Sequence, residues 1–253
     1  MIAKINKALK TLTQDRIKWL KSLHIKKFRN AESCYYVEGK KMLEEAIEYA
    51  AEEIQFIITT QESSIIELQE TFQIYYCTEK QMRQVSELKT PSAYFVVLRQ
   101  RKCELPPKGK KFLVLDGIQD PGNFGTIIRT CDWFGVEHIV CSKDTVEQYN
   151  PKVIQATMGS IFRTHINYVE LEDFIQKSDV KITGTDTKAT SLFDAREILQ
   201  ETMGLVIGNE GNGIRPVLRK IISSEISIPK IGNAESLNAA VSAGIILSNW
   251  AVK

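Results

Sequence analysis

The sequence predicts an α/β protein of two domains, a small α/β sandwich followed by a domain built on a mainly parallel sheet. Strand-like and helix-like stretches alternate before residue 99. From Phe112 onward, continuous apolar strands are separated by helical stretches, a pattern typical of a parallel sheet covered on both faces. Between the two series, RQRKCELPPKGKK (residues 99–111) is charged, proline-bearing and without apolar periodicity, which indicates a linker. We expect the domains to span residues 1–105 and 106–253.

The order of apolar stretches predicts the elements of each domain. After a helical opening, the first domain is expected to place strands at CYYVEG, EIQFIITT, QIYYC and AYFVVLR, with a helix at KKMLEEAIEYA and one before each of the last two strands. In the second domain, strands are expected at FLVLDGI, EHIVCS, HINYV, KITGT, GLVIG and EISIP, with helices after Gly122, near Val153 and after HINYV. The C-terminal SLNAAVSAGIILSNWAVK follows helical spacing at Leu237, Val241, Gly244, Ile245 and Ser248.

Charge is distributed unevenly along the chain, although the formal net charge is only +2. Residues 1–41 contain 11 Lys and Arg against 3 Asp and Glu, whereas residues 112–253 contain 13 against 17. A polyanion would therefore meet the N-terminal end first. Lysines on amphipathic helices are also commonly just a solvated face, so charge alone favours neither reading.

Composition argues against several classes of protein. No apolar run approaches the roughly 20 residues that a membrane span requires, and lysines interrupt the N-terminal stretch where an export signal would need an apolar core. Five scattered cysteines without a Cys-x-x-Cys pair favour neither a disulfide framework nor a zinc cage. His24, His138 and His165 lack ligand-like spacing, so we expect no metal. These features predict a cytoplasmic protein in a reducing compartment.

Three unusual loops follow strands of the second domain, where open α/β sheets bind their ligands. In DGIQDPGNFGTIIRT, Asn123 is expected to cap the helix that carries Arg129. The second loop, GNEGNG, has three glycines that permit close backbone approach. In IPKIGNAESLNAA, Ser236 is the expected N-cap and Asn238 the first-turn residue.

The glycine-rich loop does not match the known phosphate loops. GNEGNG has neither the GxGxxG order of a dinucleotide fingerprint nor the GK[ST] ending of a P-loop. The carboxylate of Glu210 would repel phosphate. The loop therefore favours a neutral or positive ligand held through backbone groups, although each loop taken singly also fits a purely structural role.

Taken together, the three loops resemble the motifs of the SpoU (TrmH-type) RNA 2′-O-ribose methyltransferases of the SPOUT superfamily. The order is NxGxxxR, then GNEGxG, then IPxxGxxxSLNxAVSAG, matched at Asn123, Gly125, Arg129, Gly208, Glu210, Gly213, Pro229, Gly232, Ser236, Leu237 and Asn238. The N-terminal stretches IKWLKSLHIKKFRNAESCYYVEGKKMLEEA and LKTPSAYFVV resemble the L30e-like substrate-binding domain of that family. The likeness covers nearly the whole chain.

The resemblance implies a parallel-sheet α/β-knot (trefoil knot) domain that holds S-adenosylmethionine largely through main-chain contacts. The implied cofactor-binding residues are Thr185, Asp186, Leu205, Ile207, Gly208, Asn209, Gly213, Ile228, Pro229, Ser236 and Leu237. The implied catalytic residues are Arg129, Asn123, Glu210, Ser236 and Asn238. Arg129 would accept the proton of the ribose hydroxyl or, since a guanidinium resists deprotonation, clamp phosphate and stabilise the developing alkoxide.

The resemblance also implies a homodimer packed through the knot region. Ribosomal RNA is the expected substrate, with transfer RNA as the alternative. A second hypothesis is a non-catalytic RNA-binding scaffold whose methyltransferase domain is degenerate. A nicotinamide-dependent oxidoreductase would need GxGxxG after the first strand of the second domain, which DGIQDPGNFG lacks.

Overall fold

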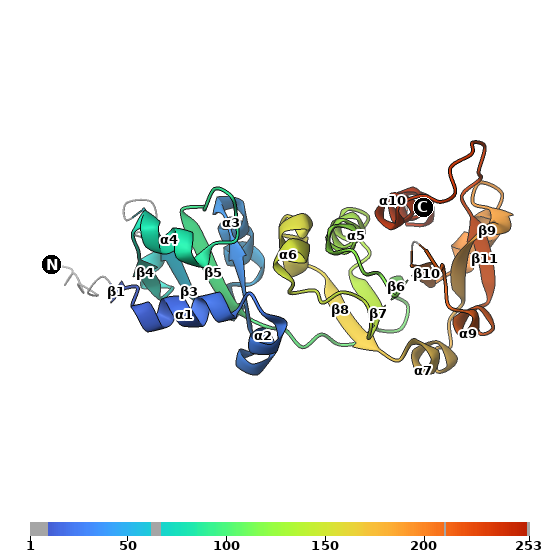
Figure 1. Cartoon of the computed structure of the whole chain (residues 1–253). Coiled ribbons are helices and arrows are strands. Elements are labelled where there is room, and N and C mark those ends of the chain that lie inside the picture. The colour runs from blue at the N-terminus through green and yellow to red at the C-terminus, as the bar shows by residue number, and fades with distance from the viewer. Residues whose placement is uncertain (1–9, 62–66, 210, 252–253) are drawn as a thin grey trace. The chain divides into compact units, whose positions relative to one another are not determined.

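The computed structural model describes residues 10–61, 67–209 and 211–251 (Figure 1). It divides the chain into two compact units, Met1–Arg101 and Lys102–Lys253. Residues 102–111 contain no helix or strand, as expected of the linker. The predicted division between residues 105 and 106 falls within this segment.

The first unit contains a mixed five-stranded sheet in the order β1-β4-β3-β5-β2. β5 runs antiparallel to β2 and β3, whereas β4 runs parallel to β1 and β3. The four strands expected from the sequence are present, and β1 is an addition. Their bounds are β1 Lys10–Thr11, β2 Cys34–Glu38, β3 Ile54–Thr59, β4 Ile74–Tyr76 and β5 Tyr94–Arg99.

Helices pack on this sheet through apolar side chains at helical spacing. One core cluster joins α1 and α4 to the strands, with Ile17 and Met82 packed among Tyr36, Phe56 and Phe95. α4 begins with a capping box between Thr78 and Gln81, while α3 packs on β2 and β5. The helices are α1 Gln14–Ser22, α2 Lys26–Glu32, α3 Lys40–Tyr49 and α4 Glu79–Val85, with short 3₁₀ turns η1 Ala51–Glu53 and η3 Glu67–Glu70.

The second unit contains a six-stranded sheet in the order β11-β9-β10-β6-β7-β8, with every pairing parallel. β6, β7 and β10 are buried along their whole length, which explains their unbroken apolar sequences. β9 is longer than the expected KITGT and shifts register opposite β11. The strands are β6 Phe112–Asp116, β7 His138–Ser142, β8 His165–Val169, β9 Ile182–Ser191, β10 Gly204–Gly208 and β11 Ser224–Ser227.

Helices cover both faces of this second sheet. Figure 1 shows α5, α6 and α10 on one face and α7 and α9 on the other. Two of the helices, α8 and α9, were not expected from the sequence. The bounds are α5 Pro121–Trp133, α6 Pro151–Thr157, α7 Leu171–Gln176, α8 Arg196–Glu201, α9 Pro216–Arg219 and α10 Ala239–Trp250, with the 3₁₀ turn η4 Ser160–Phe162. Among the described residues, no helix is both long enough and apolar enough to cross a membrane.

Candidate active site

The first two predicted loops start side by side because β6 and β10 are adjacent parallel strands. Gly208 at the end of β10 is in register with Asp116 at the end of β6. Beyond these ends, the Asn209 amide donates from Nδ2 to the carbonyl of Gly117 at 2.9 Å. The strand order therefore brings together two loops that are distant in sequence.

An ion pair between buried Asp116 and exposed Arg215 fixes the far end of the glycine-rich loop. The carboxylate of Asp116, only 1% exposed, accepts from the backbone N–H of Arg215 at 2.8 Å and from its Nε at 2.6 Å. A buried carboxylate without such donors would be strongly unfavourable. Asp116 stands out in the sequence as the one charge that ends the apolar FLVLD strand, a signal that the sequence analysis did not use.

The glycine-rich loop is a tight turn closed by its own polar groups. Asn209 Oδ1 accepts from the backbone N–H groups of Gly211 at 2.9 Å and Asn212 at 3.2 Å, and Asn209 and Gly213 exchange two backbone hydrogen bonds. Gly213 has φ of +65°, a conformation that favours glycine. The predicted catalytic residue Glu210 lies outside the described residues.

Gly208 is required by the turn itself. A Cβ at Gly208 would lie 2.2 Å from the carbonyl carbon of Gly213 and 2.3 Å from the backbone nitrogen of Ile214. The sequence predicts that the glycines let the backbone approach a ligand closely. At Gly208 the structure supplies a different reason, namely contact between two segments of the same loop.

The second and third loops line one cavity of about 680 Å³, together with Thr185, Asp186 and Thr187 of β9, whereas no residue of the first loop lines this cavity. This volume lies within the range of about 300–1,000 Å³ usual for small-ligand sites. Ten of the predicted cofactor residues line it: Thr185, Asp186, Ile207, Gly208, Asn209, Gly213, Ile228, Pro229, Ser236 and Leu237. Leu205, which is fully buried within β10, does not line the cavity.

Arg219 joins three segments of the cavity wall, a role that the sequence analysis missed. Its guanidinium pairs with Asp186 of β9 and with Glu225 of β11, the latter at 3.0 Å, and its Nε donates to the carbonyl of Ile214 at 3.2 Å. No motif marks this arginine in the sequence.

Asp186 is part of the wall rather than a free ligand group. Its Oδ1 accepts from the backbone N–H of Lys188 at 2.7 Å, and Oδ2 pairs with Arg219. The Lys188 N–H, with a further contribution from Arg219, lowers the pKa of the Asp186 carboxyl. Its carboxylate is therefore held ionised and already bound.

The helix caps differ from those expected, and the difference creates a new contact. α5 is capped by Asp120, whose Oδ1 accepts from the Asn123 N–H at 2.7 Å, with Pro121 in the first turn. The sequence predicted Asn123 as the cap of this helix, and that prediction was wrong. α10 is capped by Asn238, so the expectations of Ser236 as cap and Asn238 in the first turn were also wrong.

Asn123 lies in the first turn of α5 and Asn238 caps α10, which is the reverse of the predicted roles, and the two side chains meet. Asn238 Nδ2 donates to Asn123 Oδ1 at 2.7 Å, while Asn238 Oδ1 accepts from the N–H groups of Ala240 and Val241. Both residues were predicted to be catalytic, and a single hydrogen bond joins them next to the cavity that Ser236 and Leu237 line.

Arg129 lies apart from these residues within this chain. It is exposed on α5 and does not line the cavity. Six residues of helix separate it from Asn123, a rise of about 9 Å. No ion pair or hydrogen bond joins the Arg129 side chain to another described residue.

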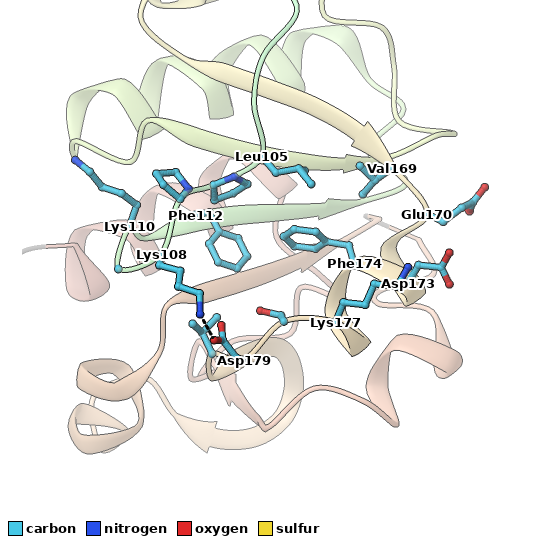
Figure 2. A pocket seen from close by; sticks show the side chains of 15 residues that line it. Leu105, Lys108, Lys110, Phe112, Val169, Glu170, Asp173, Phe174, Lys177 and Asp179 are labelled. Atoms are coloured by element: carbon cyan, nitrogen blue, oxygen red, sulfur yellow. Dashed lines mark hydrogen bonds and ion pairs between the residues drawn. The ribbon is translucent and has the colours of Figure 1, made fainter.

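A second cavity, of about 480 Å³, contains none of the motif residues (Figure 2). It lies between the linker and α7, with Phe112 and Phe174 in edge-to-face contact on its floor. Lys108 of the linker pairs with Asp179 at 2.9 Å along its edge. Within the described residues, no group of three metal-ligating side chains is present in either cavity or elsewhere.

Comparison with known proteins supports one family along most of the chain. Residues 110–248 match the model of the SpoU rRNA Methylase family, and residues 14–95 match an MRM3-like substrate binding domain. The chain is 30% identical over 249 residues to the 23S rRNA (guanosine(2553)-2′-O)-methyltransferase RlmP of Bacillus subtilis (strain 168), covering 95% of this chain and 98% of that protein.

Solved structures agree over the same length. A putative RNA methyltransferase of the TrmH family from Porphyromonas gingivalis superposes with a TM-score of 0.82 at 28% identity, covering 95% of this chain and 98% of that one. An AdoMet-bound rRNA methyltransferase from Sinorhizobium meliloti superposes with a TM-score of 0.83 at 28% identity, covering 95% of each chain. These matches show that the chain belongs to the SpoU rRNA methylase family, and two of its three motif loops line one cavity.

Proposed function

We propose that this protein is an S-adenosylmethionine-dependent methyltransferase that modifies a ribose 2′-hydroxyl of ribosomal RNA. The observation that carries the proposal is the convergence of the second and third SpoU motif loops on one cavity, beside the hydrogen bond that links Asn238 to Asn123 of the first motif loop. The relatives in Bacillus subtilis and Sinorhizobium meliloti are named as rRNA methyltransferases, and the latter structure holds AdoMet.

The cavity suits the chemistry of this cofactor. Ile207, Ile228 and Leu237 offer apolar surface for an adenine ring, and the exposed backbone of the 208–213 turn offers hydrogen-bonding groups. Arg219 is matched by two carboxylates, so the wall carries no unpaired guanidinium to repel a sulfonium. When bound, S-adenosylmethionine supplies the electrophilic methyl group for attack by the ribose oxygen.

The amide pair and Ser236 would position the ribose. Aligning two bound reactants lowers the barrier by roughly 7–11 kcal/mol. The hydrogen bond between Asn238 and Asn123 fixes the starts of α10 and α5 relative to each other, and these two helix starts would flank the ribose. Glu210 would help orient Arg129 or the ribose, as the family resemblance implies.

Arg129 would act as a charged clamp. A guanidinium remains protonated at neutral pH, so its role is to hold an RNA phosphate and to stabilise the developing alkoxide. Its exposure on α5 and its separation from Asn123 suit a group that completes the cavity of another subunit.

The assembly we infer is a homodimer built on the outer faces of α5 and α10. These helices pack together and leave apolar side chains uncovered, with Trp133 84% and Val241 51% exposed. The segment from β11 to α10 would form the trefoil knot of the family. We place the working protein in the cytoplasm, where its ribosomal substrate is made, and assign RNA binding to the first unit.

Titration calorimetry with S-adenosylmethionine, followed by methyl transfer to unmodified 23S rRNA and mapping of 2′-O-methyl sites, tests the proposal. We expect stoichiometric cofactor binding and one methylated ribose. A protein that binds RNA but neither binds the cofactor nor transfers methyl would instead be the non-catalytic scaffold.

A further inference from the structure

The corner between α1 and α2 concentrates positive charge. Residues 16–31, RIKWLKSLHIKKFRNA, contain six Lys and Arg and no Asp or Glu. Like charges in one short segment repel one another, which opposes the compact state. The placement of each cation shows which of them the fold uses internally.

Arg29 is used by the fold, since it holds the corner in shape. It is 2% exposed, and its Nη1 donates to the carbonyls of Leu23 at 2.8 Å and His24 at 2.9 Å. These carbonyls follow the end of α1, where a cation is favourable. The buried guanidinium thus fixes how α2 leaves α1.

Two further cations are also engaged within the first unit. Arg16 lies over the rings of Phe56 and Tyr75, 5.0 and 4.3 Å from their centroids. Lys18 pairs with Asp15 at 3.6 Å.

The remaining three cations, Lys21, Lys26 and Lys27, are exposed and form no ion pair with another described residue. Lys40 at the start of α3 differs from these lysines, because it pairs with Glu44 at 3.8 Å on the same helix. Glu32 ends α2 and Glu87 lies 3.5 Å from His24, but neither carboxylate pairs with Lys21, Lys26 or Lys27.

Apolar surface accompanies these lysines. Phe28 is 42% exposed and Ile25 is 55% exposed, both next to Lys26 and Lys27. An exposed aromatic ring among unpaired cations is the combination that binds unstacked nucleotides, with the ring stacking on a base and the lysines meeting phosphates.

We propose that the α1–α2 corner, defined by Lys21, Ile25, Lys26, Lys27 and Phe28, contacts a single-stranded segment of the RNA substrate. The proposal rests on the proposed function, because it presumes an RNA substrate, and adds the surface and the mode of contact. An anionic membrane is the other partner that lysines and apolar groups fit. A base-stacking role for Phe28 distinguishes the two.

The matched variants are K26A/K27A and K40A/K41A. Each removes two adjacent lysines from the first turn of a helix in the first unit, so the change in charge and in helix-dipole interaction is the same. Binding of full-length protein to in vitro transcribed 23S rRNA is measured by filter binding across a salt series. The slope of log K against log[salt] is negative, and K26A/K27A is expected to make it shallower by about 1.4, which is about 0.7 for each phosphate contact to a single strand. K40A/K41A is expected to keep the wild-type slope.

Phe28 provides the second arm. Phe28→Ala is expected to weaken RNA binding by roughly 5- to 150-fold, Phe28→Leu by a similar factor, and Phe28→Tyr little, because stacking needs a ring. Membrane binding would instead be retained by Phe28→Leu, and phosphatidylserine vesicles test it directly. If K26A/K27A loses the vesicle binding of the wild-type protein but binds RNA as well as the wild type does, the proposal is wrong.

Cofactor binding separates this inference from the proposed function. If wild-type protein binds S-adenosylmethionine and methylates RNA, yet K26A/K27A matches K40A/K41A and Phe28→Ala matches wild type, the corner is not the RNA contact. If wild-type protein does neither, the proposed function itself has failed.

Discussion

Asn238 and Asn123, 115 residues apart in the sequence, are joined by a 2.7 Å hydrogen bond from Nδ2 to Oδ1. The other end of the Asn238 amide caps α10 through the N–H groups of Ala240 and Val241. The Asn238 amide therefore caps the start of α10 and also links two motif loops. Different substitutions of Asn238 should therefore separate effects on stability from effects on activity.

Asn238→Ala should both destabilise and inactivate, whereas Asn238→Ser should mainly inactivate. Serine caps helices about as well as asparagine but cannot reach Asn123, while alanine loses the cap at a cost of about 1 kcal/mol. Urea unfolding and methyl transfer measured on the same preparations check this. Full activity in Asn238→Ser would show that the bridge has no role in catalysis.

Gly208→Ala should destabilise the protein and abolish cofactor binding. The new Cβ would meet backbone atoms of Gly213 and Ile214, and forcing an overpacked site apart costs about 1–3 kcal/mol. Gly232→Ala is the matched control, because Gly232 lines the same cavity and a Cβ there has no neighbour within 4 Å. Thermal unfolding and calorimetry with S-adenosylmethionine should separate the two variants clearly. Equal behaviour of both would contradict the steric reason given for Gly208.

Arg219→Lys should weaken cofactor binding by about tenfold, equivalent to about 1.4 kcal/mol. A single ammonium cannot replace a guanidinium that reaches Asp186, Glu225 and the carbonyl of Ile214 together. Calorimetry gives the dissociation constant, and circular dichroism confirms that the variant is folded. Wild-type affinity in Arg219→Lys would mean that the joined segments do not shape the binding site.

Arg129→Ala and Asn238→Ala should complement each other if Arg129 serves the cavity of a partner subunit. A mixed dimer would then hold one intact cavity facing one intact arginine, and random pairing would restore about a quarter of wild-type methyl transfer. Each variant alone should be inactive. No recovery on co-expression, with mixed dimers confirmed by differential tagging, would place Arg129 in its own subunit's site.

His138 should make stability depend on pH. It is 7% exposed, stacks on His165 with ring centroids 4.9 Å apart, and its Nδ1 has no hydrogen-bond partner among the described residues. Burial, with His165 adding to the effect, lowers the pKa of His138. The unfolded chain therefore binds the proton first, so the free energy of unfolding should fall as pH drops below about 6.5.

His138→Gln should flatten this part of the stability profile, because glutamine does not titrate. Urea unfolding at several pH values between about 5 and 8 measures it. His165→Gln is the companion variant, expected to reduce the slope only in part. An unchanged profile in His138→Gln would assign the titration elsewhere.

The sequence by itself determined ten of the eleven strands that the structure describes, the burial of the central ones and the identity of the motif loops. Unbroken apolar runs such as FLVLD and GLVIG follow from strands buried on both faces, so their location and type are legible locally. The expected placement of ligand-binding loops after these strands also follows from how parallel sheets are built. Ten of the predicted cofactor residues accordingly line one cavity.

Tertiary structure alone decided which polar groups meet. Asn123 and Ser236 each have the chemistry of a cap, and only the paths of the two chain segments gave that role to Asp120 and Asn238 instead. Arg219 joins segments of the cavity wall and Arg215 fixes the end of the glycine-rich loop. Both roles depend on carboxylates that other strands supply, Asp186 for Arg219 and Asp116 for Arg215. Local patterns encode burial and turn geometry, whereas a hydrogen bond between residues 115 apart depends on how the whole sheet is ordered.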